Sequence, residues 1–185
     1  MKQQHNDSIK SKKAAELRQT FDHSFALPPS AASPEVQDLL TIRVLGNPYA
    51  IRLLDITELL TGHKIIPVPA VTSGLLGLAG IRGDIVPVFC LSSIIGYGPD
   101  IESPRWMVLC NPEEPIALAF SDFEGHLRIP TSALHTAEKF SATTEKTKYV
   151  SQVARTPDGI RAIISIEPIM ATIRNRISTH RPTKE

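Results

Sequence analysis

The stretch LLGLAGIRGDIVPVFCL, residues 75–91, carries the strongest indication of the fold class. Glycine recurs at every third position along and just before it, at Gly74, Gly77, Gly80 and Gly83. This spacing suits neither a helix interior nor a well-packed central strand, because each glycine forgoes side-chain packing and costs backbone entropy. We therefore expect some other group to approach this backbone closely.

The middle of the same stretch predicts a hairpin. Residues 80–84, Gly-Ile-Arg-Gly-Asp, form a tight reversal with Arg82 at its tip, and residues 85–91 follow as a strand. Pro87 inside that strand predicts an edge strand or a bulge, since proline cannot donate to a sheet ladder. An edge strand beside glycines and a projecting arginine would form a docking surface, because exposed backbone can pair with a partner while a guanidinium fixes its orientation.

The chain outside this stretch is also mainly extended. Period-two alternation and turn residues predict one hairpin over 39–53, with its turn at Gly46, Asn47 and Pro48, and a second over 148–166. Further strands are expected at 64–68, 106–110, 116–123 and 127–129, a helical turn at 91–95, and a closing helix at 167–177, while 55–60 is ambiguous between a helical turn and a strand. Many short strands with few helices favour small barrels or a sandwich over a parallel sheet.

The first 37 residues differ from the rest, because they are rich in polar residues, alanine and proline and poor in large apolar groups. We expect a flexible tail there, in which Ala14, Leu17, Phe21 and Phe25 fall at helical spacing. That stripe predicts either an amphipathic helix that docks or a fraying helix in solvent. Residues 38–177 are expected to form one domain and residues 178–185 a second tail.

Composition excludes several functional classes. Twenty basic and 19 acidic side chains leave a formal charge of +1, so nothing points to nucleic acid or an anionic membrane. Cys90 and Cys110 each lie in an apolar run, which predicts buried, reduced thiols. No stretch has the length of a signal peptide core or of a membrane span, so we expect a cytoplasmic protein without direct membrane insertion.

Residues 80–91 resemble the signature of CheW-type domains, the adaptors of bacterial chemotaxis arrays. That signature places an Asn-Leu-Arg-Gly turn before an apolar strand containing Val-Pro, and here it reads Gly-Ile-Arg-Gly followed by Ile-Val-Pro-Val at 85–88. Weaker similarities run in order on both sides, at 48–51, 55–59, 66–69, 117–123 and 163–166. Two positions depart from the pattern, since Gly80 replaces the family's Asn and Cys90 replaces its Asp.

The resemblance implies a mainly β fold of two small five-stranded SH3-like barrels packed together, without an active site or a cofactor. It also implies an adaptor that bridges a CheA-type histidine kinase and the cytoplasmic tip of a methyl-accepting chemoreceptor. By position, Gly77, Arg82 and Gly83 match residues tied to partner binding, and Glu58 matches an acidic position tied to receptor contact. Each residue also has a purely structural interpretation. Arg82 would be a surface arginine that hydrogen-bonds neighbouring loops, Gly77 a bend, and Glu58 a solvated charge on a short element.

Other functions find less support in the residues. The glycines match no phosphate-binding loop, because neither GxGxxG nor GxxxxGK[ST] occurs and the following element is β-rich. The six histidines form no metal-binding pattern, and Glu124-Gly125-His126 predicts an exposed loop because no nucleophile accompanies it. His23 and His135, in segments that could be helical, are weak candidates for a phosphoacceptor. A stand-alone barrel that binds peptide or nucleic acid remains the alternative, although aromatics are only 5%.

Overall fold

The computed structural model describes residues 35–69, 72–98, 104–111, 113–137 and 148–179. The chain divides into two units, Met1–Pro34 and Glu35–Glu185, and the described residues belong to the second. The apolar stripe at Ala14, Leu17, Phe21 and Phe25 and the candidate His23 therefore lie outside the described residues.

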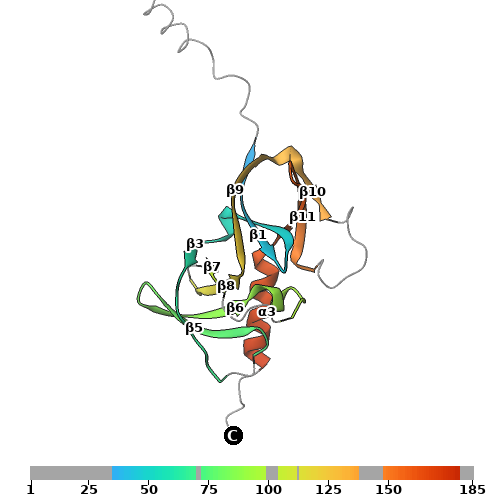
Figure 1. Ribbon diagram of the computed structural model, residues 1–185. Coiled ribbons are helices and arrows are strands. Elements are labelled where there is room, and N and C mark those ends of the chain that lie inside the picture. The colour runs from blue at the N-terminus through green and yellow to red at the C-terminus, as the bar shows by residue number, and fades with distance from the viewer. Residues whose placement is uncertain (1–34, 70–71, 99–103, 112, 138–147, 180–185) are drawn as a thin grey trace, which may run out of the picture. The chain divides into compact units, whose positions relative to one another are not determined.

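The described chain is mainly β and forms two six-stranded sheets (Figure 1). Sheet A has the order β10-β11-β12-β2-β1-β9 and sheet B has the order β3-β7-β8-β6-β5-β4. The strands of sheet A are β1 (Val36–Val44), β2 (Asn47–Arg52), β9 (Asp122–Pro130), β10 (Leu134–Thr136), β11 (Val150–Thr156) and β12 (Gly159–Ile164). The strands of sheet B are β3 (Glu58–Thr61), β4 (Ile65–Ile66), β5 (Leu75–Ile81), β6 (Asp84–Cys90), β7 (Trp106–Cys110) and β8 (Ile116–Phe120).

The helices are short, apart from the last. The 3₁₀ turns η1 (Leu53–Asp55) and η2 (Thr131–Ala133) follow β2 and β9, α2 (Leu91–Ile94) follows β6, and α3 (Ile166–Thr179) closes the domain. The α3 helix begins one residue earlier and ends two residues later than its apolar spacing predicts. Within the described residues, no helix combines the length and the hydropathy that crossing a membrane requires.

Three groups of buried side chains explain how the sheets pack. One group lies within sheet A and a second within sheet B, as expected for two small barrels. The third and largest contains residues of both sheets, α2 and α3, so it joins the two. The predicted fold of two packed SH3-like barrels is confirmed, although each sheet has a sixth strand. The extra members are the shortest described strands, β4 and β10, each at one end of its sheet.

The strand β8 contributes to two of these cores. Ile116, Leu118 and Phe120 belong to the core between the sheets, while Ala117 and Ala119 belong to the core of sheet B. All five residues are therefore buried, whereas the sequence predicts a strand here without predicting burial on both of its faces. The small side chains face the interior of the barrel, where space is limited, and the large ones fill the interface between the sheets.

Sheet B is inserted into sheet A in the sequence. Sheet B uses the continuous stretch 58–120, whereas sheet A combines the β1–β2 hairpin with strands that begin at Asp122. A parallel pairing of β2 with β12, from Ala162 opposite Tyr49 to Ile164 opposite Ile51, joins the two halves of sheet A. Each sheet is thus continuous in space, although the strands of sheet A come from two segments of the chain that sheet B separates.

The first hairpin is confirmed, but its turn begins one residue earlier and ends two residues earlier than predicted. Leu45 and Gly46 form the two-residue loop with φ angles of 50° and 75°, and Asn47 and Pro48 already belong to β2. Two positive φ angles give the twist that a two-residue hairpin needs. The second hairpin turns at Pro157 and Asp158 between β11 and β12, as predicted.

Candidate partner-binding surface

The hairpin between β5 and β6 holds Arg82 at its tip, as predicted. Ile81 pairs with Asp84, so Arg82 and Gly83 alone form the loop, with φ angles of 53° and 93°. Positive φ at both positions is the requirement of a type I′ turn, and glycine meets it at no steric cost. The arginine side chain is 71% exposed, so most of it is available to another molecule.

Arg82 forms an ion pair with Glu58, the first residue of β3, with Nη2 3.0 Å from Oε1. The strands β3 and β5 lie far apart in the order of sheet B, so this contact ties the hairpin tip to the opposite part of the sheet. Two residues that the resemblance associates with partners therefore lie side by side. Because exposed ion pairs add about 0–1 kcal/mol, stability alone gives little reason for the pair.

The second carboxylate oxygen of Glu58 supports the same view. Oε2 is buried and has no hydrogen-bond partner among the described residues. An unsatisfied buried acceptor costs free energy and calls for an explanation beyond stability. Arg82 therefore holds the carboxylate through Oε1, while Oε2 stays unpaired inside the protein.

The glycines of this hairpin differ in what surrounds them. A Cβ on Gly77 would lie 2.2 Å from the Ile66 carbonyl oxygen, so the close approach predicted from the glycine spacing occurs here, and β4 of the same chain makes it. A Cβ on Gly80 or Gly83 would meet no atom within 4 Å. Gly77 is buried and supports the sheet from within, whereas Gly80 and Gly83 lie on open surface.

The prediction that Pro87 marks an edge strand or a bulge is confirmed only locally, because β6 as a whole is not an edge strand. The strand pairs with β5 along one side, and its residues 88–90 pair with β8 on the other. Only the first half, Asp84–Pro87, lacks a partner on the β8 side among the described strands. Pro87 fits an interior strand because it stands just before the β8 pairing begins, where no ladder hydrogen bond is required.

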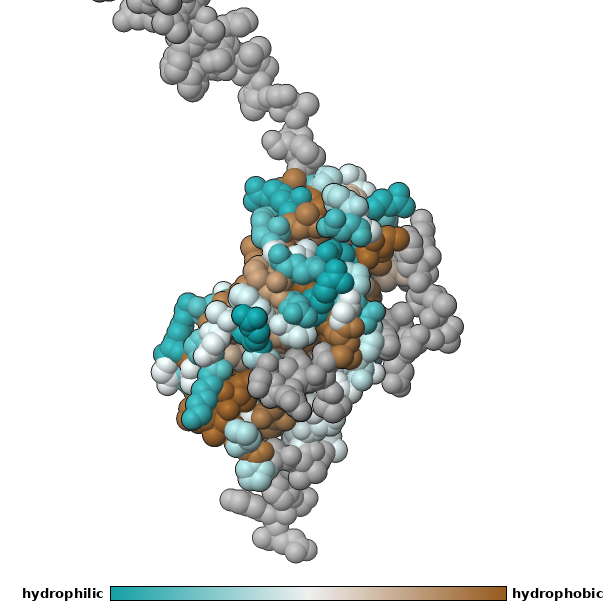
Figure 2. Space-filling model, in the orientation of Figure 1, coloured by the Kyte–Doolittle hydropathy of each residue, from teal (hydrophilic) through white to brown (hydrophobic). Residues whose placement is uncertain are grey.

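One face of the β4-β5-β6 ribbon is apolar and turned outward. Register places Ile66 beside Leu78 and Pro87, and Ile85 beside Gly80, all on the same face because side chains alternate along a strand. Ile66 is 57% exposed and Ile85 is 76% exposed, so we call these five residues the outer face. Figure 2 shows apolar side chains gathered where β5 and β6 lie in Figure 1. Exposed apolar groups next to an arginine are typical of an interaction site.

A groove of about 530 Å³ lies between the chain preceding Glu58 and α3. Leu54 on its rim is 92% exposed, and Asp55, Ile56, Glu167 and Met170 are among the residues that line it. Burial raises the pKa of Asp55, and the negative charge of Glu167 adds to this, while Arg52 acts in the opposite direction.

Asp55→Asn is expected to stabilise the domain at neutral pH. The raised pKa means that the folded state favours the protonated carboxyl, so ionisation of Asp55 lowers stability as pH rises above about 4. The amide removes that cost, and thermal melts should show a Tm higher by on the order of 1 °C at pH 7, with no difference below about pH 4. Asp122→Asn, at an exposed position, is the control. A gain that persisted unchanged in acid would contradict this explanation.

The comparisons with known proteins are consistent with this arrangement. The model of the CheW-like domain family matches residues 38–174. The chain belongs to this family. No curated protein matches the sequence. Among solved structures, the scaffolding protein TtCheW from Thermoanaerobacter tengcongensis has a TM-score of 0.64 and 19% identity, over 74% of this chain and 92% of that chain. At this identity the similarity shows the fold.

This CheW-like domain differs from its family pattern at two positions that the structure describes. Gly80 lies on the outer face, where the missing side chain leaves the backbone open. Cys90 is buried at the end of β6, with Sγ 3.0 Å from Ser92 Oγ, and neither cysteine forms a disulfide. Cys110 is also buried, and burial raises its pKa to about 12. Both cysteines match the prediction of buried, reduced thiols.

The polar residues considered for catalysis in the CheW-like domain lie in strands. Glu124, Gly125 and His126 belong to β9, which contradicts the predicted loop, because Gly125 and His126 pair with β1 and Glu124 is the extra residue of a bulge opposite Thr41 and Ile42. Glu124 binds two arginines, and His126 Nε2 lies 2.8 Å from Asp38 Oδ1. His135 lies in β10, so the helix assumed for a phosphoacceptor does not form there. No group of His, Cys, Asp and Glu within the described ranges could hold a metal ion.

Proposed function

We propose that this protein is a non-enzymatic adaptor that couples chemoreceptors to a CheA-type histidine kinase. The site we assign to partner binding comprises Arg82, Gly83 and Glu58, with the outer face beside them. Gly77 acts on the same site from beneath, because it lets β4 pack against β5. Membership of the CheW-like domain family and the likeness to a scaffolding protein support this role.

The ion pair between Arg82 and Glu58 is the observation that carries the proposal. Its arginine side chain is 71% exposed, and the pair lies at the tip of the hairpin that bears the outer face. A partner carboxylate can bind the free edge of the guanidinium in a fork geometry while apolar groups cover Ile85 and Ile66. Affinity then comes from the apolar contact and orientation from the arginine.

The alternative, a stand-alone barrel that binds nucleic acid, finds less support on this surface. Oligonucleotide-binding barrels combine stacked aromatic side chains with a positively charged groove. The outer face contains isoleucine, leucine, proline and glycine, and the neighbouring arginine is paired with a carboxylate. Such a face favours a protein partner.

The test is a pull-down with the CheA-type kinase and a receptor signalling domain from the same cell. The intact protein should retain both, and Arg82→Ala should weaken the retention of at least one by about tenfold, as expected for loss of a charge-assisted interface contact. Ile85→Ser should have a similar effect, because it removes the most exposed apolar side chain of the outer face. Arg155→Ala changes an exposed arginine of sheet A and should behave like the intact protein.

Two results would count against the proposal in different ways. If the intact protein retains neither kinase nor receptor, the adaptor role is refuted. If it retains both and neither Arg82→Ala nor Ile85→Ser changes the retention, the role stands and the assigned surface is wrong. A parallel titration with a labelled oligonucleotide should show no binding, and tight binding would favour the alternative.

A further inference from the structure

Three exposed apolar side chains lie together at the start of β1. Val36 is 50% exposed, Leu53 is 41% exposed and Leu54 is 92% exposed, and all three line one pocket of about 290 Å³. The register explains the grouping, because Leu39 pairs with Arg52 and the residues before Leu39 therefore run beside η1. A contiguous exposed apolar surface of this kind is typical of a place where another segment or molecule binds.

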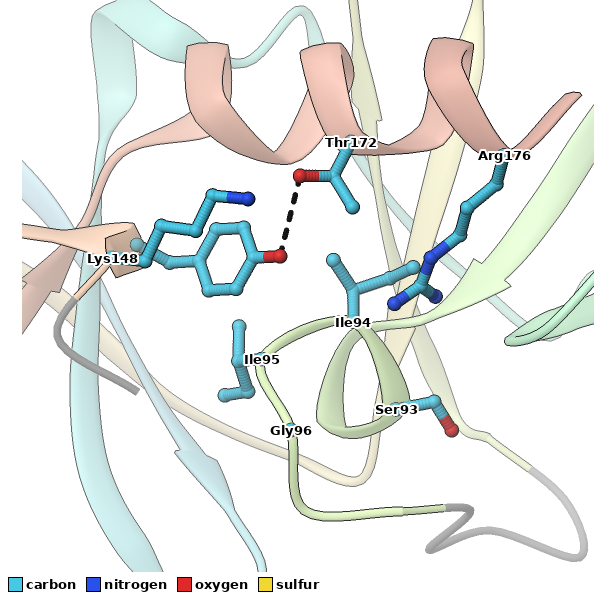
Figure 3. Close-up of a pocket in the computed structure, with 8 residues that line it drawn as sticks. Ser93, Ile94, Ile95, Gly96, Lys148, Thr172 and Arg176 are labelled. Carbon is cyan, nitrogen blue, oxygen red and sulfur yellow. Dashed lines mark hydrogen bonds between the residues drawn. The ribbon is translucent and has the colours of Figure 1, made fainter. Parts of the chain in front are cut away.

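The pocket on α3 that Figure 3 shows offers no such surface. Its volume is about 330 Å³, but its large apolar residues Ile94 and Ile95 are buried. The hydroxyls of Tyr149 and Thr172 in its wall lie 3.2 Å apart and bind each other. The pocket at the start of β1 differs in exposure rather than in volume, because its apolar side chains can be contacted without any movement of the domain.

Leu54 also borders the groove of about 530 Å³ between η1 and α3, so it stands between two hollows of the surface. Within the described part of the chain, Glu167 in that groove forms no ion pair, whereas Arg174 in its wall is bound to Glu114. Asp55 adds a second carboxylate to the same lining. The surface next to the exposed leucine is therefore acidic.

The sequence before Glu35 contains groups that match both features. Its apolar stripe, Ala14, Leu17, Phe21 and Phe25, falls at helical spacing. The stretch KSKKAAELR at 10–18 has four basic side chains and one acidic side chain. A helix as short as 14–25 is only marginally stable in water, so it needs an apolar surface to cover its stripe.

The connection between the stripe and the pocket is short. Nine residues, 26–34, separate Phe25 from Glu35, and an extended chain of that length spans about 30 Å. Val36, the next residue, already lines the pocket. A short linker gives an effective concentration on the order of 1 mM, so a segment with a Kd of about 0.1 mM would be bound in about nine molecules of ten.

We propose that residues 14–25 bind as a helix to Val36, Leu53 and Leu54 of the same chain, with their basic side chains toward Glu167. The apolar stripe then covers the most exposed leucine of the described residues. The opposite charges of the segment and the groove favour this occupant, and its attachment close to Val36 favours it over a free partner. The proposal is independent of the adaptor function, because it concerns the chain without any partner.

Limited digestion of the full chain with trypsin tests the contact, with cleavage after Arg18 followed by mass spectrometry. Arg18 lies within the segment, and its cleavage rate reports the fraction of molecules in which the segment is unbound. We expect cleavage about tenfold slower than in a synthetic peptide of residues 8–27. Leu54→Ser and Phe21→Ser should each bring the rate to within about twofold of a peptide of matching sequence, because each removes one side of the apolar contact.

The double variant and a control make the test specific. Leu54→Ser combined with Phe21→Ser should be cleaved no faster than either single variant, since a contact can be lost only once. Ile160→Ser removes an apolar side chain that is about half exposed in β12, outside the pocket, and should leave the rate within about twofold of the intact protein. Leu54 is almost fully exposed, so its replacement leaves the core intact, and thermal melts check this.

Four outcomes would overturn the proposal. Cleavage of the intact protein at the rate of the peptide means that the segment does not bind. An equal acceleration in Ile160→Ser means that it adheres to apolar surface in general. Protection that increases with protein concentration assigns the pocket to the segment of a second copy. Protection that arises only after a receptor signalling domain or the kinase is added assigns the pocket to that partner.

Discussion

Gly77→Ala is expected to lower the free energy of unfolding by about 3 kcal/mol, a large part of the stability of a typical domain. A Cβ at this position would lie 2.2 Å from the Ile66 carbonyl oxygen and 2.7 Å from its carbonyl carbon. The φ angle of 150° lies where residues with a side chain are strained. The atoms closest to this Cβ belong to the backbone of Ile66 and Pro67, so rotating a side chain cannot make room for the methyl group.

The neighbouring structure explains why relief is costly. β4 has only two residues, and it is held through the pairing of Ile65 with Ala79 and of Ile66 with Leu78. A bulge between Leu75 and Gly77 sets the register of β5 against β6. Moving β4 away from the methyl group would break its pairing, and rotating Gly77 would change that register.

Urea unfolding monitored by circular dichroism measures the loss, and Gly80→Ala is the matched control. Gly80 lies three residues along the same strand, and a Cβ there meets no atom within 4 Å, so we expect a change within about 0.5 kcal/mol. If Gly77→Ala costs less than about 1 kcal/mol, the close approach of β4 is not maintained in solution. If the prediction holds, Gly77 variants should lose partner binding in proportion to their loss of stability.

Glu124→Ala is expected to cost about 2 kcal/mol of stability at neutral pH, because it leaves a buried guanidinium without its carboxylate. Arg161 has a side chain that is only 8% exposed, and its Nη1 donates to Glu124 Oε2. Arg43 donates from Nε to the other carboxylate oxygen at 2.6 Å. One glutamate of β9 thus joins arginines from β12 and β1, two strands that β2 separates in the sheet.

The effect of Glu124→Ala should depend on pH. Partial burial opposes ionisation of Glu124, but hydrogen bonds from Arg161 and Arg43 outweigh it and hold the pKa below its usual value of 4.5. A lowered pKa means that the stabilisation is complete above about pH 5 and is lost as pH falls through the lowered value. Urea titrations at pH 7 and pH 3 should show the difference between the proteins shrinking in acid.

Glu114→Ala is the control for this experiment. Its ion pair with Arg174 has the ordinary distance of 2.9 Å, but both side chains are about half exposed, so we expect a loss below about 0.5 kcal/mol. Equal losses in the two variants would show that burial of Arg161 contributes nothing. A loss in Glu124→Ala that is unchanged at pH 3 would exclude the charge as its cause.

Much of the fold is predictable from local pattern, because turns and alternation act over a few residues. The reversal at Arg82 and Gly83 and the turn at Pro157 and Asp158 are examples. The failures involve contacts between distant segments. The complete burial of β8 depends on having a core on each of its faces, and the position of β9 depends on its pairing with β1. Neither condition is visible in a short window of sequence.

The candidate site was predicted through family resemblance, and its geometry was not. Two strands, β4 and β5, lie between Glu58 and Arg82 in the sequence, so their ion pair follows only from how sheet B closes. The outer face was missed because its residues come from three strands, each contributing one or two apolar side chains.

The insertion of sheet B within sheet A affects how the protein emerges from the ribosome. Synthesis proceeds from the amino terminus, so all of sheet B, residues 58–120, is available to fold before β9 exists. The β1–β2 hairpin must wait about 70 residues for its next strand, with the apolar side chains of Leu39, Leu40 and Ile42 uncovered. At the end of this interval the nascent chain would contain the complete barrel of sheet B and a hairpin with exposed apolar side chains. That form of the protein would most need a chaperone.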